Sequence, residues 1–155
     1  MGKKISNIHY AYIAGFLDGD GTIMAIIERH KEKKFKFRVR ISLEFTQHED
    51  NIIILQCIKK IIGSGSLSSS NKRVWKLSVK NTKVLKEILK KLEPFVVAKT
   101  RQIILALKIL NSEVNTRNDL LRMGRLADRL SGFNIKSRSR RLNTSRLLEA
   151  FSRND

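Results

Sequence analysis

The chain has 155 residues, which suits one domain of ordinary size and is too short for two independent cores. Lys and Arg outnumber Asp and Glu by 32 to 14, so the formal net charge is +18 and a polyanionic partner is expected. No apolar run approaches the roughly 20 residues of a membrane-spanning helix. The first residues are charged and carry no apolar signal segment, so we expect neither a membrane partner nor secretion.

Cysteine and histidine give no sign of a metal site. Cys57, the only cysteine, lies in the apolar stretch 52–62 and is expected to be a buried core residue. A single cysteine cannot form an internal disulfide, which suits a reducing compartment. The histidines, His9, His30 and His48, lack the spacing of zinc ligands, so structural zinc is not expected.

A capped helix of about three turns is the first predicted element. It begins at Ser6 or Asn7 and ends near Leu17, and Gly19 and Gly21 favour a helix end there. Beyond them the apolar residues recur with a period of two, which is the pattern of a half-buried strand.

Two strands are predicted next, over residues 22–27 and 35–47. From Phe35 to Thr46 an apolar residue alternates with a polar one, so one sheet face is apolar and the other is polar and basic. The charged stretch 28–34 separates the strands and predicts a hairpin with a long polar tip.

The same succession of a helix and a hairpin then repeats and ends in another helix. These elements are predicted over residues 51–62, 64–70, 73–80 and 81–92. Gly63 and Pro94 mark the ends of the two helices. The first 93 residues or so therefore predict the order αββαββα, an α+β fold with one four-stranded antiparallel sheet and helices on its apolar face.

The rest of the chain is predicted to be helical, over residues 99–110, 116–130 and 144–151. The last two helices are separated by the segment 134–141, which contains four basic residues and no acid. We treat residues 1–155 as a single domain, with a core at about 6–113 and a basic helical extension at about 114–155.

The first helix carries apolar residues on two sides, although a helix that only covers a sheet needs one. Ala11, Gly15 and Gly19 recur every fourth position, and small residues at this spacing let two helix backbones approach closely. We expect two copies of the chain to pair along Ala11, Tyr12, Gly15 and Gly19. A helix buried on all sides within one subunit is the alternative.

Asp18 and Asp20 lie among glycines at the end of the same helix. An i,i+2 pair points in different directions, so the two acids are expected to have different roles. A carboxylate beside the last carbonyls of a helix is unfavourable unless a cation binds there. Asp20 and the Gly19 carbonyl offer the oxygen ligands that suit Mg²⁺ or Ca²⁺, and paired helices would bring two such sites together for phosphodiester hydrolysis. A simple Asp-Gly turn is the alternative.

Residues 13–21, with the sequence IAGFLDGDG, resemble the signature motif of the LAGLIDADG homing endonucleases. The order αββαββα is also the core fold of that family, so the resemblance covers most of the chain. The single copy of the motif is similar to the homodimeric branch, typified by algal chloroplast intron enzymes.

The resemblance implies roles for individual residues. Asp20 would be the metal-binding catalytic acid, and the Gly19 carbonyl would be a second metal ligand. Gln47 would order water in the active site, and Lys99 would lie near the scissile phosphate. Asp18 matches no catalytic role and is expected to shape the helix end. Mg²⁺ is the implied cofactor, with Mn²⁺ as a substitute and Ca²⁺ binding without supporting cleavage.

Asn51 departs from the pattern of the family, because homodimeric relatives tend to carry a basic residue at this position. Asn51 could still hold water as part of the catalytic site, or Arg101 could supply the missing positive charge. Both alternatives stay open.

The polar sheet face, doubled in a dimer, is expected to follow the major groove of DNA. Arg38 and Arg40 are candidates for bidentate contacts to guanine, and Glu28 and Glu44 for accepting from cytosine. A solvated sheet face is the alternative. The residues predicted to face the bases are Met24, Ile26, Glu28, His30, Arg38, Arg40, Glu44, Thr46, Ser66, Ser68, Ser70 and Lys76. Those predicted to contact phosphates are Lys33, Lys34, Lys72, Arg73, Lys136, Arg138, Arg140 and Arg141.

Together these features predict a Mg²⁺-dependent homodimeric endonuclease for double-stranded DNA. It would cut both strands of a long near-palindromic site across the minor groove, leave short 3′ overhangs as its relatives do, and promote intron mobility. We expect it in a chloroplast or mitochondrion if it is organelle-encoded, and otherwise in the prokaryotic cytoplasm. A non-cleaving nucleic-acid binder or an RNA maturase on the same fold is the alternative. A ribosomal structural protein would explain the charge but not the motif.

Overall fold

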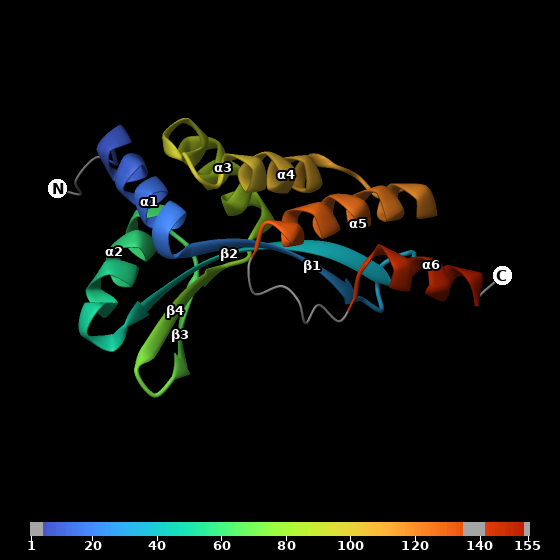
Figure 1. Ribbon diagram of the computed structural model, residues 1–155, viewed down its shortest axis with the longest axis horizontal. Helices are drawn as coiled ribbons and strands as arrows, with labels where there is room; N and C mark the ends of the chain where they lie inside the picture. Colours follow the sequence, from blue (N-terminus) through green and yellow to red (C-terminus); the bar gives the residue numbers. More distant parts are fainter. Residues whose placement is uncertain (1–4, 135–141, 154–155) are drawn as a thin grey trace.

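A computed structural model describes residues 5–134 and 142–153, and its elements confirm the predicted order (Figure 1). The elements are α1 (Asn7–Asp20), β1 (Gly21–Arg29), β2 (Phe37–His48), η1 (Glu49–Asn51), α2 (Ile52–Ile62), β3 (Ser66–Asn71), β4 (Val74–Val79), α3 (Thr82–Leu92), η2 (Glu93–Phe95), α4 (Thr100–Asn111), α5 (Arg117–Gly132) and α6 (Thr144–Ser152). None of these described helices is long and apolar enough to cross a membrane.

The four strands form one antiparallel sheet in the order β1-β2-β4-β3. Strand β2 pairs with β1 from Phe37 to Phe45 and with β4 from Leu43 to His48, so it links the two hairpins. Helices α3, α4 and α5 lie on one side of the sheet, and the β3–β4 hairpin bends away from them (Figure 1). The layer arrangement predicted from the alternation of β2 is therefore confirmed.

The core lies between the sheet and the helices that pack on it, which include α1 and α2. Ile23 of β1 and Leu43 of β2 are fully buried against Leu17 of α1 and Leu89 of α3. A fully buried side chain of this size stabilises the fold by about 1.5–3 kcal/mol. Burying the apolar face in this way leaves most side chains of the other sheet face at least partly exposed.

Helix α1 is longer than predicted. Its start agrees with the prediction, because Ser6 is the N-cap and its backbone N–H donates to Nδ1 of His9 at 3.1 Å. The helix continues beyond Leu17 to Asp20, and Gly19 lies within it without a positive φ angle. Gly19 therefore does not end the helix, and Asp20 is its last residue, directly before β1.

Cys57 is exposed, so the prediction that it belongs to the core is wrong. Helix α2 buries Leu55 and Ile58. Cys57 lies on another side of the helix, one turn from Ile53, which is also exposed. The apolar residues of α2 thus lie on more sides of the helix than the core covers.

Candidate functional site

The end of α1 and the end of β2 bring Asp20 and Gln47 together. Nε2 of Gln47 donates to Oδ2 of Asp20 at 3.1 Å. Gln47 lies opposite Trp75 of β4 and shares the sheet face of Phe45, so the strand directs its amide toward the helix end. Asp20 is exposed, so its carboxylate can reach a ligand outside the chain.

Lys99 approaches the same helix end from the start of α4. Its Nζ donates to the carbonyl oxygen of Leu17 at 2.8 Å and to that of Asp18 at 2.7 Å. An ammonium group at this place offsets the negative end of the helix dipole. The structure thus gathers Asp20, Gln47 and Lys99, which lie far apart in the sequence, at one end of α1.

Asp18 fixes the segment that carries Lys99. Its Oδ2 accepts hydrogen bonds from the backbone N–H groups of Val97, at 2.7 Å, and Ala98, at 3.1 Å. Its Oδ1 accepts from the backbone N–H of Lys99 at 3.0 Å. Sequence patterns do not reveal this role, because the partners of Asp18 lie 79 to 81 residues away.

Replacing Asp18 by Ala is expected to lower the free energy of unfolding by about 1.5–3 kcal/mol, because three backbone donors lose a charged acceptor. Urea unfolding measures this change. Asp18→Asn is the matched control and should lose less, because its amide oxygen still accepts. Equal stability of the Ala variant and the wild type would show that water replaces the carboxylate at no cost.

The oxygen ligands at this helix end suit a hard divalent cation but do not complete its coordination. The Asp20 carboxylate and the carbonyl of Gly19 are donors of the kind that Mg²⁺ and Ca²⁺ prefer. The described part of the chain contains no cluster of three or more His, Cys, Asp or Glu side chains that could hold a metal. A complete site therefore needs further oxygens, from a second copy of this helix end or from phosphate groups.

Asn51 and Arg101 remain candidates that the geometry does not select. Asn51 is exposed at the N-cap of α2, and Arg101 is exposed in the first turn of α4. Among the described hydrogen bonds, none joins either residue to Asp20, Gln47 or Lys99.

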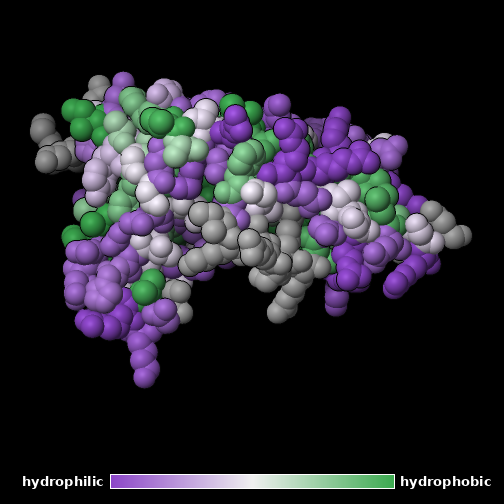
Figure 2. Space-filling model, in the orientation of Figure 1, coloured by the Kyte–Doolittle hydropathy of each residue, from purple (hydrophilic) through white to green (hydrophobic). Residues whose placement is uncertain are grey.

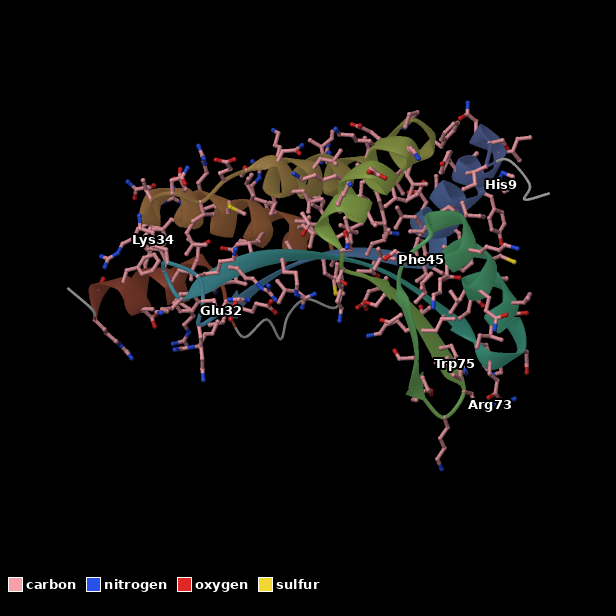
Figure 3. The ribbon with its side chains drawn as sticks, turned by 180° about the vertical axis from the view of Figure 1, so that it is seen from behind. His9, Glu32, Lys34, Phe45, Arg73 and Trp75 are labelled. Carbon is pink, nitrogen blue, oxygen red and sulfur yellow. The ribbon has the colours of Figure 1, made fainter. Side chains whose placement is uncertain are left out.

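The polar face of the sheet is built as the alternation predicts. Ile26 lies opposite Arg40, and Thr46 lies opposite Lys76. The sheet is curved, with Glu32 and Lys34 near the tip of one hairpin and Arg73 near the tip of the other (Figure 3).

Both acids on this face are engaged within the protein. Glu28 forms ion pairs with Arg38 at 2.6 Å and Arg40 at 3.2 Å. Glu44 accepts a hydrogen bond from Ser78 at 3.1 Å and lies 3.4 Å from Nζ of Lys76. To accept from cytosine, either carboxylate would have to leave these partners.

Most of the other residues predicted to face DNA bases lie on or beside this face. Met24 is partly exposed on β1, and Ser66 and Ser68 are exposed on β3. His30 lies one residue beyond the end of β1, in the turn, and is therefore not part of the strand. The side chain of Ser70 falls outside the described part of the structure.

The residues predicted to contact phosphates lie at the hairpin tips or outside the described residues. Lys33 and Lys34 are exposed, and Nζ of Lys34 donates to the carbonyl oxygen of Asn115 at 3.3 Å. Lys72 is exposed, and Arg73 forms an ion pair with Glu49 at 2.8 Å. Outside the described residues lie Lys136, Arg138, Arg140 and Arg141.

The side of α1 that faces away from the sheet is exposed and apolar. Ile8 is 80% exposed and Tyr12 is 51% exposed, and Figure 2 shows apolar residues gathered at this end of the molecule. A Cβ added to Gly15 or Gly19 would meet nothing within 4 Å. The structure therefore excludes the alternative that α1 is buried on all sides within one subunit.

Comparison with known proteins agrees with this geometry. The model of the LAGLIDADG endonuclease family matches residues 13–110. The DNA endonuclease I-CvuI of Chlorella vulgaris is 33% identical over 125 residues, which are 79% of this chain and 78% of that protein. The DNA endonuclease I-CreI of Chlamydomonas reinhardtii is 32% identical over 110 residues, 71% of this chain and 67% of that protein.

The fold is also that of a solved relative. The crystal structure of I-CvuI in complex with its target in the presence of Ca has a TM-score of 0.87 to this structure and 29% sequence identity, covering 95% of this chain and 94% of that one. The motif, the gathered site, the sequence relatives and this shared fold lead to one conclusion. The chain belongs to the LAGLIDADG endonuclease family and is a homing endonuclease, an enzyme that cleaves DNA target sites.

Proposed function

We propose that the enzyme works as a Mg²⁺-dependent homodimer that cuts both strands of a long, near-palindromic DNA site and thereby promotes intron mobility. The observation that carries this proposal is the gathering of Asp20, Gln47 and Lys99 at the end of α1, the helix that also presents an exposed apolar side. A near-palindromic site follows from two-fold symmetry, because each copy meets one half of the DNA.

The dimer would form along the stripe of Ala11, Tyr12, Gly15 and Gly19. These residues are exposed in the single chain, and the two glycines leave room for close approach of a second helix. Since Asp20 is the last residue of the same helix, pairing would bring two copies of its carboxylate to the dimer axis. This arrangement would supply oxygens that one chain lacks.

Each residue of the site would contribute differently to the reaction. Asp20 and the carbonyl of Gly19 would hold the cation, which when bound activates water and stabilises charge on the phosphate. Gln47 holds Oδ2 of Asp20 through its amide and would orient the attacking water. Lys99 would place a positive charge near the scissile phosphate, and Asp18 fixes its backbone.

The polar sheet face would lie in the major groove, with the base-facing residues of β1, β2, β3 and β4 directed at the DNA. Support comes from the net charge of +18 and from I-CvuI, whose structure was solved in complex with its target. The algal relatives also support synthesis in an organelle, with the prokaryotic cytoplasm as the other location.

Cleavage of a randomised library of DNA duplexes tests the proposal. With Mg²⁺ we expect discrete double-strand breaks at related, near-palindromic sequences, and no breaks when a chelator removes the ion. Mn²⁺ should restore cleavage, whereas Ca²⁺ should support binding alone. If the protein retains DNA or RNA but never cuts, it is a nucleic-acid binder or a maturase.

A further inference from the structure

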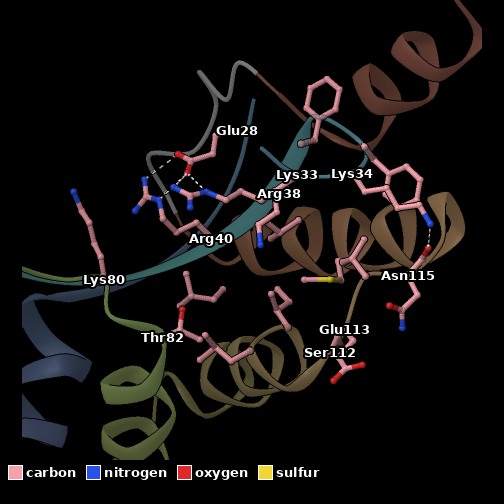
Figure 4. Close-up of a pocket in the computed structure, with 18 residues that line it drawn as sticks. Glu28, Lys33, Lys34, Arg38, Arg40, Lys80, Thr82, Ser112, Glu113 and Asn115 are labelled. Carbon is pink, nitrogen blue, oxygen red and sulfur yellow. Dashed lines mark hydrogen bonds and ion pairs between the residues drawn. The ribbon is translucent and has the colours of Figure 1, made fainter. Parts of the chain in front are cut away.

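Glu28 lies on the polar sheet face beside the two arginines that are predicted to contact guanine. The register places Glu28 directly opposite Arg38 and places Ile26 opposite Arg40. Side chains two residues apart on a strand share a face. Arg38 and Arg40 of β2 therefore both lie within reach of a single carboxylate on β1 (Figure 4).

The contacts of this carboxylate with the two arginines are unequal. Nε and Nη2 of Arg38 each lie 2.6 Å from Oε1 of Glu28. Arg40 makes longer contacts, from Nε to Oε1 at 3.2 Å and from Nη2 to Oε2 at 3.3 Å. Nη1 of Arg40 is buried and has no hydrogen-bond partner among the described residues. Glu28 thus leaves part of the donor capacity of Arg40 unused.

Glu28 keeps its negative charge at neutral pH. Partial burial alone would raise the pKa of Glu28, but the hydrogen bonds and charges of Arg40 and Arg38 outweigh it and hold this pKa below its usual value. Glu28 is therefore ionised under the conditions of any DNA-binding assay. Its negative charge offsets the repulsion between the two guanidinium groups.

The spacing of the two arginines suits bases that are two steps apart along the DNA. Residues two apart on a strand are separated by about 6.6 Å, close to two base steps of about 3.4 Å along one DNA strand. A guanidinium group recognises guanine through a pair of hydrogen bonds, which requires a fixed orientation of its plane. Holding two arginines in place before binding reduces the entropy that they lose on the DNA.

We propose that Glu28 is a positioning residue for DNA recognition, which holds Arg38 and Arg40 at a fixed spacing so that they recognise nearby bases of each half-site as a unit. This inference rests on the proposed function, since that places the sheet face in the major groove. It replaces the prediction that Glu28 itself accepts a hydrogen bond from cytosine.

Selection of randomised duplexes by binding tests the proposal with the full-length wild type, Glu28→Gln and Glu32→Gln. Glu32→Gln is the control, because it removes the same charge from an exposed residue of the same hairpin. The wild type and Glu32→Gln should select one consensus. Glu28→Gln should lose about tenfold or more of the discrimination at the bases that Arg38 and Arg40 recognise, and keep it elsewhere. Arg38→Gln and Arg40→Gln identify these bases.

Glu28→Asp keeps the charge but is too short to hold both arginines as Glu28 does. Glu28→Asp should lose the same discrimination. It serves as the test variant in place of Glu28→Gln if thermal unfolding shows that the Gln variant is misfolded. An unchanged consensus in the Glu28 variants overturns the proposal, as does a wild type that selects no consensus. Loss of one cytosine preference at a position that neither arginine variant affects also overturns it, because Glu28 would then contact the base itself.

Adding Mg²⁺ to the selected duplexes separates this proposal from the proposed function. A wild type that selects a consensus but does not cut it contradicts the catalytic proposal and leaves the role of Glu28 standing. A wild type that cuts its consensus, while Glu28→Gln selects and cuts the same sequences with the same preference, contradicts only the role of Glu28.

Discussion

The Asp20→Asn protein is expected to bind its DNA site and to leave it uncut. Asparagine keeps the size of the side chain and a carbonyl oxygen, so Nε2 of Gln47 still has an acceptor. The variant lacks the negative charge that would hold the cation. Loss of several kcal/mol of transition-state stabilisation corresponds to a cleavage rate lower by about a thousandfold or more.

Single-turnover cleavage of the selected site, together with a binding isotherm, measures this effect. Glu87→Gln is a suitable control, because it removes one negative charge from an exposed position on α3 and should leave the rate unchanged. A rate for Asp20→Asn within tenfold of the wild type would show that another group holds the cation. Loss of binding as well would mean that the carboxylate serves DNA affinity rather than chemistry.

Gly15→Leu is expected to convert the enzyme into a folded monomer that cannot make double-strand breaks. A Cβ at Gly15 meets nothing within 4 Å in the single chain, so the fold can accept the side chain. At a close contact between two helices the added atoms overpack the interface, at a cost of about 1–3 kcal/mol for each copy. The dissociation constant of the dimer should therefore rise by on the order of a hundredfold or more.

Sedimentation velocity across a range of concentrations measures the change in oligomeric state. Gly132→Leu is the matched control, because Gly132 is also exposed and has nothing within 4 Å of an added Cβ, but lies on α5 away from the stripe. The control should associate as the wild type does. A Gly15→Leu protein that remains dimeric would place the interface on a different surface.

Local chemistry explains why the elements could be predicted from the sequence. Gly63 ends α2 in the left-handed conformation, with a φ of 75°, and Asn81 caps α3 by accepting from the backbone of Val84. Each of these signals acts within a few residues. The alternation along β2 likewise predicts which side of the sheet is covered.

Contacts between distant segments were beyond the reach of these local signals. The sequence predicts only that Asp18 shapes the helix end, whereas its carboxylate also binds the backbone of Val97, Ala98 and Lys99. The pairing of Glu28 with Arg38 depends on the register of two strands, which the length of the turn sets. Cys57 looked buried because apolar neighbours do not reveal which side of α2 the core covers.

Asp20 and Lys99 were identified by a different kind of information. An acid at a helix end, or one lysine among many basic residues, is not identified as a site residue by its chemistry alone. The resemblance to a family selected both of them, and the hydrogen bonds at the end of α1 place Lys99 beside the motif that holds Asp20. Both residues therefore lie at one end of α1, and their catalytic roles stay a prediction.

The residues of α1 have several roles at once, which limits the positions at which this enzyme can change to acquire a new target. Within the motif, Ile13 and Leu17 are buried in the core, and Gly15 is exposed on the stripe that we propose to pair with a second chain. Asp18 accepts a hydrogen bond from the backbone of Val97, and Asp20 accepts one from Gln47. A substitution there disturbs several properties at once. The sheet face that we propose to contact DNA has fewer such roles, so evolution or protein engineering could retarget the enzyme through the strands while the helix stays constant.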